Sequence, residues 1–326
     1  MHFALVALGS LFLLTTLAPV RAQDPAWEWQ LPPGFPEPLV PATNPMSRAK
    51  VTLGELLFME PGLAVNGKLS CSDCHHPTNY FVDNVVVPSG ALGDELAFNT
   101  PTLWNVAYST SFSWVDKGLD ELEAQHMGPL TNTDPVELGT SLQRLQSVQA
   151  KPKIAAALNA AFPEQDGTLQ LETVVAALAS YLRTLVRAGT PFDEYVFGDN
   201  ASALTTEAQR GLELFTSPRL NCAACHRGFL LSGPTRSARA EFPPSFYQTG
   251  IDSQTRTLAV RAPSLRFVQH TAPYMHNGSM DTLDAVLDFY ETADRALLGP
   301  KASLRMRPFK LTTDERRALL AFLQSL

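Results

Sequence analysis

The sequence CSDCH at residues 71–75 decides the fold of this chain. It places a histidine directly after two cysteines that are three positions apart, and the same pattern returns as CAACH at residues 222–226. Two thiols at this spacing can bond the vinyl groups of one porphyrin while the adjacent imidazole reaches its iron, so the pattern predicts covalent haem c. The expected attachment residues are Cys71, Cys74 and His75 for the first haem, and Cys222, Cys225 and His226 for the second.

The same four cysteines allow a second interpretation. An exported protein can oxidise each pair to a disulfide, as thiol-redox proteins do. A histidine directly after both pairs favours haem attachment, because a redox disulfide has no need of that residue.

The first 22 residues resemble an export signal. An apolar run covers residues 3–17, and small residues Val20 and Ala22 stand where a signal peptidase requires them. We expect a signal peptide at 1–22 and a periplasmic protein, although the start is poor in Lys and Arg. An uncleaved membrane anchor is the alternative, but the run is short for a membrane span.

Composition indicates a globular chain that does not bind nucleic acid. The 326 residues are 45% hydrophobic, which is enough to bury two domain cores. Without Arg21, the only charged residue of the signal, 24 basic residues stand against 32 acidic ones, a net charge of −8. Nucleic-acid binding requires a basic surface. No later stretch is long and apolar enough to span a membrane.

Residues 23–45 are rich in proline, and we expect them to form an extended segment along the surface. An internal duplication follows this lead. GELLF at 54–58 precedes the first haem motif and GLELF at 211–215 precedes the second; TPTLWNV at 100–106 is matched by APSLRFV at 262–268. The chain is therefore predicted to contain two copies of one haem domain. We expect an N-terminal haem domain at 46–198 that reacts with peroxide and a C-terminal haem domain at 199–326.

Helical patterns indicate the fold class. Apolar residues recur at helical spacing over 171–186, and capping signals predict helix starts at Thr206 and Thr313. No stretch alternates convincingly as a strand. The expected fold is mainly α, with two cytochrome c-like haem domains related by internal duplication. The residues of the expected buried stripe are Leu171, Val174, Val175, Leu178, Leu182 and Leu185.

Each haem iron has a second axial face, and its ligand sets the chemistry. A Met thioether raises the potential of electron carriers, whereas a Tyr phenolate is the ligand in some haem oxidoreductases. Tyr290 ends a helical stripe formed by Leu283, Val286 and Leu287, so it is also readily a core aromatic. The Met candidates are Met46, Met59, Met127, Met275, Met280 and Met306.

The motifs together resemble the bacterial di-haem cytochrome c peroxidase and MauG superfamily over nearly the whole mature chain. They are the two haem motifs, NTPTLWNV at 99–106, SFSWVDKGLDELEAQHMGPL at 111–130, DPVELG at 134–139 and RAPSLRFVQHTAPYMHNGSMDTL at 261–283. The lead at 29–58 and NCAACHRGFLLSGP at 221–234 are most similar to the MbnH-like branch.

This resemblance implies unequal haems. The family places a Met, or a Tyr in MauG relatives, fourteen positions after the histidine of PYxHxG; from His276 that position is Tyr290. The peroxidases place a distal histidine about sixteen residues after the first haem histidine, where this chain has Ala91. The implied first iron is open and the second is bound by His226 and Tyr290. We expect His76 at the surface or beside a propionate.

The resemblance also implies a peroxide pocket, in which Glu137 moves the proton that O–O cleavage requires while Gln125 and Pro129 shape the site. The alternative for Glu137 is structural, because Asp134, Pro135 and Glu137 also make a helix start.

Two further sites follow from the resemblance. Trp114 corresponds to an indole between the two haems that carries charge; its alternative is a core aromatic, as we expect for Trp104. WVDK replaces the family's usual Trp-Asp-Gly-Arg at this point. A calcium ion would take the side chain of Asn99 and the carbonyls of Thr271 and Pro273.

The implied activity is that of a MauG-like and MbnH-like enzyme. It would use hydrogen peroxide to form a high-valent di-haem state and oxidise a residue, a tryptophan, of an exported and copper-related partner protein. A di-haem cytochrome c peroxidase that takes electrons from a small cytochrome is the first alternative, favoured if Met275 or Met280 binds the second iron. A non-enzymatic electron carrier is the second, and needs both irons closed.

Overall fold

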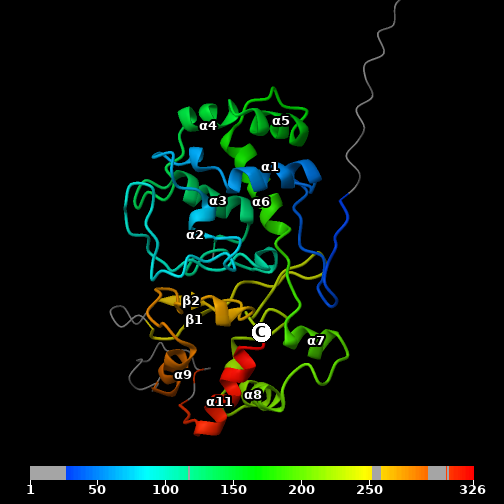
Figure 1. Ribbon diagram of the computed structural model, residues 1–326, viewed down its shortest axis with the longest axis vertical. Helices are drawn as coiled ribbons and strands as arrows, with labels where there is room; N and C mark the ends of the chain where they lie inside the picture. The colour runs from blue at the N-terminus through cyan, green and yellow to red at the C-terminus, as the bar shows by residue number, and fades with distance from the viewer. Residues whose placement is uncertain (1–26, 117, 252–257, 293–305, 307) are drawn as a thin grey trace, which may run out of the picture.

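The computed structural model describes residues 27–116, 118–251, 258–292, 306 and 308–326 (Figure 1). The predicted signal peptide at 1–22 lies outside the described residues. Among the described helices, none has the length and apolar character needed to cross a membrane. The chain forms two lobes: α1 to α6 lie in the upper lobe of Figure 1, and α7, α8, α9 and α11 lie in the lower one.

The upper lobe is built around two crossing helices, α1 and α6, which pack extensively on each other. Ser47 caps α1 by accepting a hydrogen bond from the backbone N–H of Lys50, as expected of a serine N-cap. The helical elements of this lobe are α1 (Arg48–Phe58), η1 (Pro61–Leu63), α2 (Cys71–Cys74), η2 (Val106–Tyr108), α3 (Leu122–Thr131), α4 (Leu142–Gln149), α5 (Pro152–Ala161) and α6 (Leu171–Arg183).

The lower lobe repeats the arrangement with α8 and α11. Thr312 caps α11 in a capping box with Glu315, so the expected start at Thr313 is confirmed. Helix α8 also starts where expected, although its cap is Thr205. The elements of this lobe are α7 (Pro191–Phe197), α8 (Thr206–Thr216), η3 (Cys222–Ala224), β1 (Phe246–Gln248), β2 (Ala259–Arg261), η4 (Val268–His270), α9 (Leu283–Thr292) and α11 (Thr313–Leu323).

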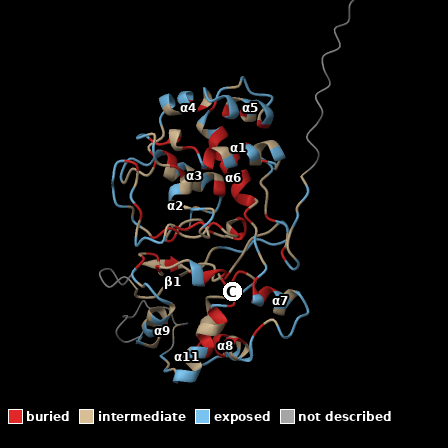
Figure 2. Ribbon diagram, viewed as in Figure 1, coloured by how far each residue is buried: buried red, intermediate tan, exposed pale blue. Residues whose placement is uncertain are grey.

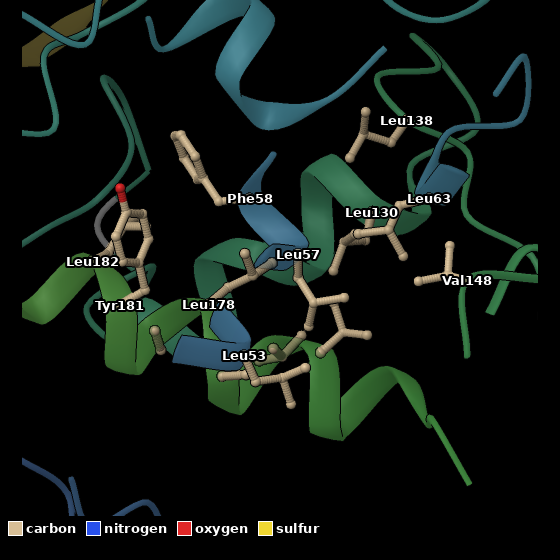
Figure 3. Packing of buried hydrophobic residues seen from close by; sticks show 14 of the residues in the cluster. Leu53, Leu57, Phe58, Leu63, Leu130, Leu138, Val148, Leu178, Tyr181 and Leu182 are labelled. Carbon is tan, nitrogen blue, oxygen red and sulfur yellow. The ribbon is translucent and has the colours of Figure 1, made fainter. Parts of the chain in front are cut away.

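Each lobe has its own hydrophobic core, visible as the red interior of the helices in Figure 2. In the upper core, Leu53 and Leu57 of α1 lie beside Leu178 and Leu182 of α6 (Figure 3). The expected stripe of α6 is confirmed, since its members are buried or pack against this core. The upper cluster ends at residue 185 and the lower one begins at residue 192, so α7 packs with the lower core although the predicted N-terminal domain extends to residue 198. The domain boundary between residues 198 and 199 stays a prediction.

The duplication extends to the backbone. Asn105 and Phe267, which occupy the same place in the two copies, both adopt left-handed conformations with φ of 63° and 61°. Each precedes a short 3-10 helix, η2 or η4. Left-handed φ values are unusual for residues with side chains, so their recurrence indicates one turn used twice. The mainly helical fold of two related haem lobes is therefore confirmed.

The proline-rich lead connects the lobes. From residue 27 to 45 it has no helix or strand. Phe35 packs edge-on against Tyr108 of the upper lobe and Phe229 of the lower one. The hydroxyl of Tyr108 also donates a hydrogen bond to the carbonyl oxygen of Pro36, at 2.7 Å. The lead thus covers the junction between the lobes.

A small antiparallel ribbon was not foreseen from the sequence. Strand β1 pairs with β2, with Tyr247 opposite Val260. The expectation of no strands was wrong here because each strand has only three residues, too few for a two-residue alternation to become visible. The ribbon matters because it ends at Arg261, beside the second copy of the Pro-Ser-Leu segment.

Two glycines allow the paired helices to cross closely. A β-carbon on Gly54 would overlap the carbonyl oxygen of Ala177 in α6, and one on Gly211 would overlap that of Ala318 in α11. These equivalent glycines explain why GELLF and GLELF recur: only glycine fits where two helix backbones touch.

We therefore expect Gly54→Ala and Gly211→Ala each to lower the free energy of unfolding by about 2 to 3 kcal/mol, because the added methyl group forces the helices apart. Urea unfolding of the purified holoprotein measures this. Gly128→Ala in α3 is the matched control; its nearest neighbour is 3.5 Å from the added carbon, so stability should stay equal or rise slightly. Equal losses in all three variants would contradict the close-crossing argument.

Candidate functional site

A cavity of about 590 Å³ extends through both lobes and is lined by both haem motifs. Its walls include His75 from the upper lobe and His226 from the lower one. The residues expected to act around the haems also line it, namely Trp114, Gln125, Pro129, Glu137 and Tyr290. His76 is exposed and is not among the lining residues. The two halves therefore contribute to one continuous site.

Both haem histidines are oriented by a contact between Nδ1 and a backbone carbonyl oxygen. Nδ1 of His75 lies 3.1 Å from the carbonyl oxygen of Phe81, and Nδ1 of His226 lies 2.9 Å from that of Leu231. Phe81 and Leu231 both have positive φ, 58° and 52°. With Nδ1–H donating to a carbonyl, Nε2 carries the lone pair that an iron ligand requires. Burial lowers the pKa of both histidines, which keeps them neutral.

The cysteines also fit haem attachment. The described residues include all four cysteines, and no disulfide joins any of them. Burial raises the pKa of Cys71 to about 12 and the charge of Glu137 adds to the rise. Each lobe therefore presents two thiols and one neutral imidazole to the cavity, and these residues can hold one haem c in each lobe.

Helix α3 and the loop that follows it line the same cavity as His75. Oε1 of Gln125 is buried and has no hydrogen-bond partner among the described residues, so it can accept a bond from a molecule in the cavity. Helix α3 is held in place because Arg183 of α6 donates to both carboxylate oxygens of Glu123, at 2.8 and 2.7 Å. Both partners lie largely out of solvent, and a fork-shaped pair of this kind fixes geometry as well as charge.

Glu137 lies in the loop between α3 and α4. No helix starts at Asp134, because α4 begins at Leu142 and is capped by Ser141. The structural alternative for Glu137 was therefore wrong. Burial alone raises its pKa to about 7. A carboxyl group that ionises near neutral pH can both accept and return a proton at the working pH.

The sequence analysis missed His126, which lines the same cavity next to Gln125. Its Nδ1 lies 2.5 Å from the carbonyl oxygen of Leu122, one turn earlier in α3. Burial lowers its pKa to about 4, so the ring is neutral with an Nε2 lone pair available. Its haem-facing position follows from helical spacing, since Leu122 and Pro129 are four and three residues away. His126 is therefore a candidate for the second ligand of the first iron.

Tyr290 enters the cavity from α9. Burial raises the pKa of its phenol, and the nearby thiols of Cys222 and Cys225 add to that effect. Tyr290 therefore lies close to the second haem motif. Met275 also lines the cavity, whereas Met280 does not. An ionised phenol is costly at this depth unless a cation, such as iron, lies beside it.

Trp114 lies at the junction of the lobes and only 9% of its surface is exposed. Its indole Nε1 donates to the carbonyl oxygen of Asn99 at 3.0 Å. Its own carbonyl oxygen accepts a hydrogen bond from the backbone N–H of Arg261, also at 3.0 Å. Trp104 likewise lines the cavity and packs edge-on against Phe81, 5.0 Å between ring centres.

The expected calcium ligands lie along the cavity, but calcium binding stays a prediction. Asn99, Thr271 and Pro273 are all lining residues. The amide nitrogen of Asn99 donates to the carbonyl oxygens of Val85 and Val86, which leaves its Oδ1 for an ion. In the described part of the chain there is no group of three or more His, Cys, Asp and Glu residues placed to hold a metal ion.

Comparison with known proteins gives the class of this site. A family described as di-haem cytochrome c peroxidase matches residues 48–201. The chain is 35% identical over 297 residues to methylamine utilization protein MauG of Methylorubrum extorquens, covering 88% of this chain and 80% of MauG. It is 32% identical over 342 residues to cytochrome-c peroxidase IdrP1 of Denitromonas iodatirespirans, covering 94% and 89%.

A solved structure agrees with these relatives. It is that of a MauG-like protein associated with microbial copper homeostasis, which is 32% identical, has a TM-score of 0.86, and covers 92% of this chain and 95% of its own. The site and fold define a di-haem c-type oxidoreductase. This chain belongs to the family of di-haem cytochrome c peroxidases and MauG, whose members act on peroxide, and it carries two haem c groups.

The raised pKa of Glu137 predicts that the reaction with peroxide depends on pH. Raised to about 7 by burial, the carboxyl group is protonated below that pH and becomes a proton acceptor above it. We expect the rate constant for the reaction with peroxide to rise about tenfold from pH 6 to pH 8, following ionisation of Glu137. Stopped-flow spectra over this range measure the rate.

Glu137→Gln should be slower by about 10²-fold and independent of pH, since the amide cannot ionise. Glu95→Gln, in the neighbouring loop outside the cavity lining, is the control and should keep the wild-type profile. If the pH dependence of the wild-type rate constant persists in Glu137→Gln, the ionising group is a residue other than Glu137.

Proposed function

We propose that this protein is a periplasmic MauG-like enzyme that uses hydrogen peroxide to oxidise a tryptophan of a partner protein. Peroxide reacts at the haem held by His75. The second haem, held by His226 and Tyr290, shares the oxidising equivalents, and Trp114 connects the two. The observation that carries the proposal is the inequality of the two halves of the cavity: one offers Gln125 and Glu137, the other a buried phenol beside the haem motif.

The pocket opposite His75 supports peroxide cleavage. Bound haem supplies the iron that accepts an oxygen atom and two oxidising equivalents from peroxide. Glu137 would take a proton from one oxygen of the bound peroxide and give it to the other, which would leave as water. Gln125, whose Oε1 has no partner in the part of the chain that the structure describes, would orient the bound molecule by accepting its hydrogen bond. Glu137 is only partly exposed, and desolvation raises its pKa to about 7, so at neutral pH it can both accept and return this proton.

Tyr290 supports storage of charge at the second haem. Its phenol ionises only when a cation compensates the cost of burial, so metal binding and loss of the proton are coupled. An anionic oxygen ligand favours higher oxidation states of iron than a neutral thioether does. The position of Trp114 between the lobes supports its role as a connecting aromatic ring, bonded to both.

The nature of the partner rests on relatives. The similar solved structure is associated with microbial copper homeostasis, and the MauG relative is a methylamine utilization protein. We infer that the partner is an exported, copper-related protein and that the oxidised residue is a tryptophan. The predicted signal peptide at 1–22 supports export of this chain, and its relatives' family is periplasmic.

Two rivals have specific observations behind them. A cytochrome c peroxidase fed by a small electron carrier is favoured by similarity to IdrP1 and by Met275, a potential thioether ligand in the cavity. A non-enzymatic electron carrier is favoured by His126, whose neutral imidazole could close the first iron.

The central test uses the ferric holoprotein without prior reduction. We expect one equivalent of peroxide to abolish the electron paramagnetic resonance signals of both ferric haems within one turnover. In Tyr290→Phe the signal of the second haem should persist. Tyr274→Phe is the matched control, since its hydroxyl lines the cavity but donates to the carbonyl oxygen of Val268 at 3.1 Å. A wild-type protein that reacts only after reduction of one haem would favour the peroxidase.

A second test concerns His126. We expect the first haem of the ferric wild-type protein to be high-spin, and His126→Leu to leave that spin state unchanged. His270→Leu, at an exposed histidine outside the cavity lining, is the control. A low-spin first haem that becomes high-spin only in His126→Leu would show that His126 closes the iron, and would favour the carrier.

A further inference from the structure

Arg261 lies directly against Trp114. It is the last residue of β2, and its guanidinium carbon is 5.2 Å from the centre of the Trp114 ring system. Its backbone N–H donates to the carbonyl oxygen of Trp114 at 3.0 Å. The backbone bond fixes the start of the side chain, and the cation–π contact fixes its end. Arg261 is therefore held at one distance from the indole.

The positive charge of Arg261 has no counter-ion in the described part of the protein. Its Nε is buried and has no hydrogen-bond partner, and no described carboxylate forms an ion pair with it. Burial lowers its pKa to about 10, so the group is still charged at neutral pH. A buried charge without a partner is unfavourable, so an anion is expected beside it.

A molecule that fills the cavity can supply this anion, because Arg261 is one of the lining residues. Each haem c carries two propionate carboxylates, and a guanidinium binds a carboxylate through two parallel hydrogen bonds. Arg187 makes a useful contrast. It lies over the ring of Trp104 at 5.1 Å but is exposed, so water can solvate its charge.

We propose that Arg261 binds a haem propionate in this cavity and, from that position, raises the potential at which Trp114 gives up an electron. The inference rests on the proposed function for the role of Trp114, but the propionate contact stands independently. A cation over an indole disfavours the positively charged, oxidised ring. With both haems bound, this would favour the neutral indole whenever charge passes between the haems through Trp114.

Arg261 has a counterpart in the first copy of the repeat. When Pro101 is aligned with Pro263, Arg261 corresponds to Asn99. Both positions bond Trp114, one through the carbonyl oxygen and the other through the backbone N–H. Only one copy carries a charged side chain. The equivalent backbone positions of the two copies thus both bond Trp114, one at its indole and the other at its carbonyl oxygen, but only the second copy places a charge beside the ring.

The test compares Arg261→Gln with Arg261→Lys, both as holoproteins with two haems loaded. Redox titration of the untreated protein measures the haem potentials without peroxide. We expect Arg261→Gln to raise the ferric-to-ferrous ratio of the haem nearer Arg261 on the order of tenfold at a fixed applied potential, because a positive charge is lost. Arg261→Lys should stay close to wild type. Arg187→Gln, at the exposed arginine over Trp104, should leave both haems unchanged.

A second readout follows the indole. After one equivalent of peroxide, electron paramagnetic resonance should detect a tryptophan radical in Arg261→Gln at several times the wild-type amount, and none in the double variant with Trp114→Phe. Unchanged haem potentials and an unchanged radical yield in Arg261→Gln would overturn the proposal. So would a shift of the haem potential in Arg261→Lys as large as that in Arg261→Gln. If Arg261→Gln binds no haem, the haem potentials of Arg261→Lys decide. Potentials close to those of the wild type show that the positive charge is what matters, and shifted potentials overturn the proposal.

A failure of the proposed function gives a different result. The potentials would still shift in Arg261→Gln, whereas peroxide would produce no radical in any variant. In that case Arg261 binds a propionate and the charge-transfer role of Trp114 is wrong.

Discussion

The two backbone-linked hydrogen bonds of Trp114 determine how the halves of this protein meet. Its indole donates to Asn99 and its carbonyl oxygen accepts from Arg261, and these residues hold the same place in the two copies of the repeat. A bond to each copy fixes the ring where the lobes join. One cavity then reaches both haem motifs, and every functional residue discussed above shares it.

Duplication supplies what the two haem sites need in common. Each lobe uses a glycine to bring two helices into backbone contact, and each fixes its haem histidine through a carbonyl of a residue with positive φ. These requirements are geometric and identical for any haem c, so both copies retain them. The residues that differ line other parts of the cavity. The upper lobe contributes α3 and the loop of Glu137, whereas the lower lobe contributes α9 and Tyr290.

Burial gives the individual groups their chemistry. Glu137 has no charged partner, so its pKa rises into the neutral range. Glu123 is also buried, but hydrogen bonds and the charge of Arg183 outweigh that burial and hold its pKa below the usual value. One carboxylate is thus available for proton transfer, while the other anchors α3. The same contrast distinguishes Arg266, which is paired with Asp193, from Arg261, which has no described carboxylate partner.

The haem motifs, the duplication and the mainly helical fold could all be predicted from the sequence alone, because covalent attachment and helical packing impose local spacings that can be counted. It also indicated Tyr290, Glu137 and Trp114, but through family resemblance. Only the tertiary structure brought His126 and Arg261 into the cavity and removed the helix start at Asp134. Which side chains share a cavity, and which buried charges lack partners, depends on contacts between segments far apart in the chain, and no local pattern encodes them.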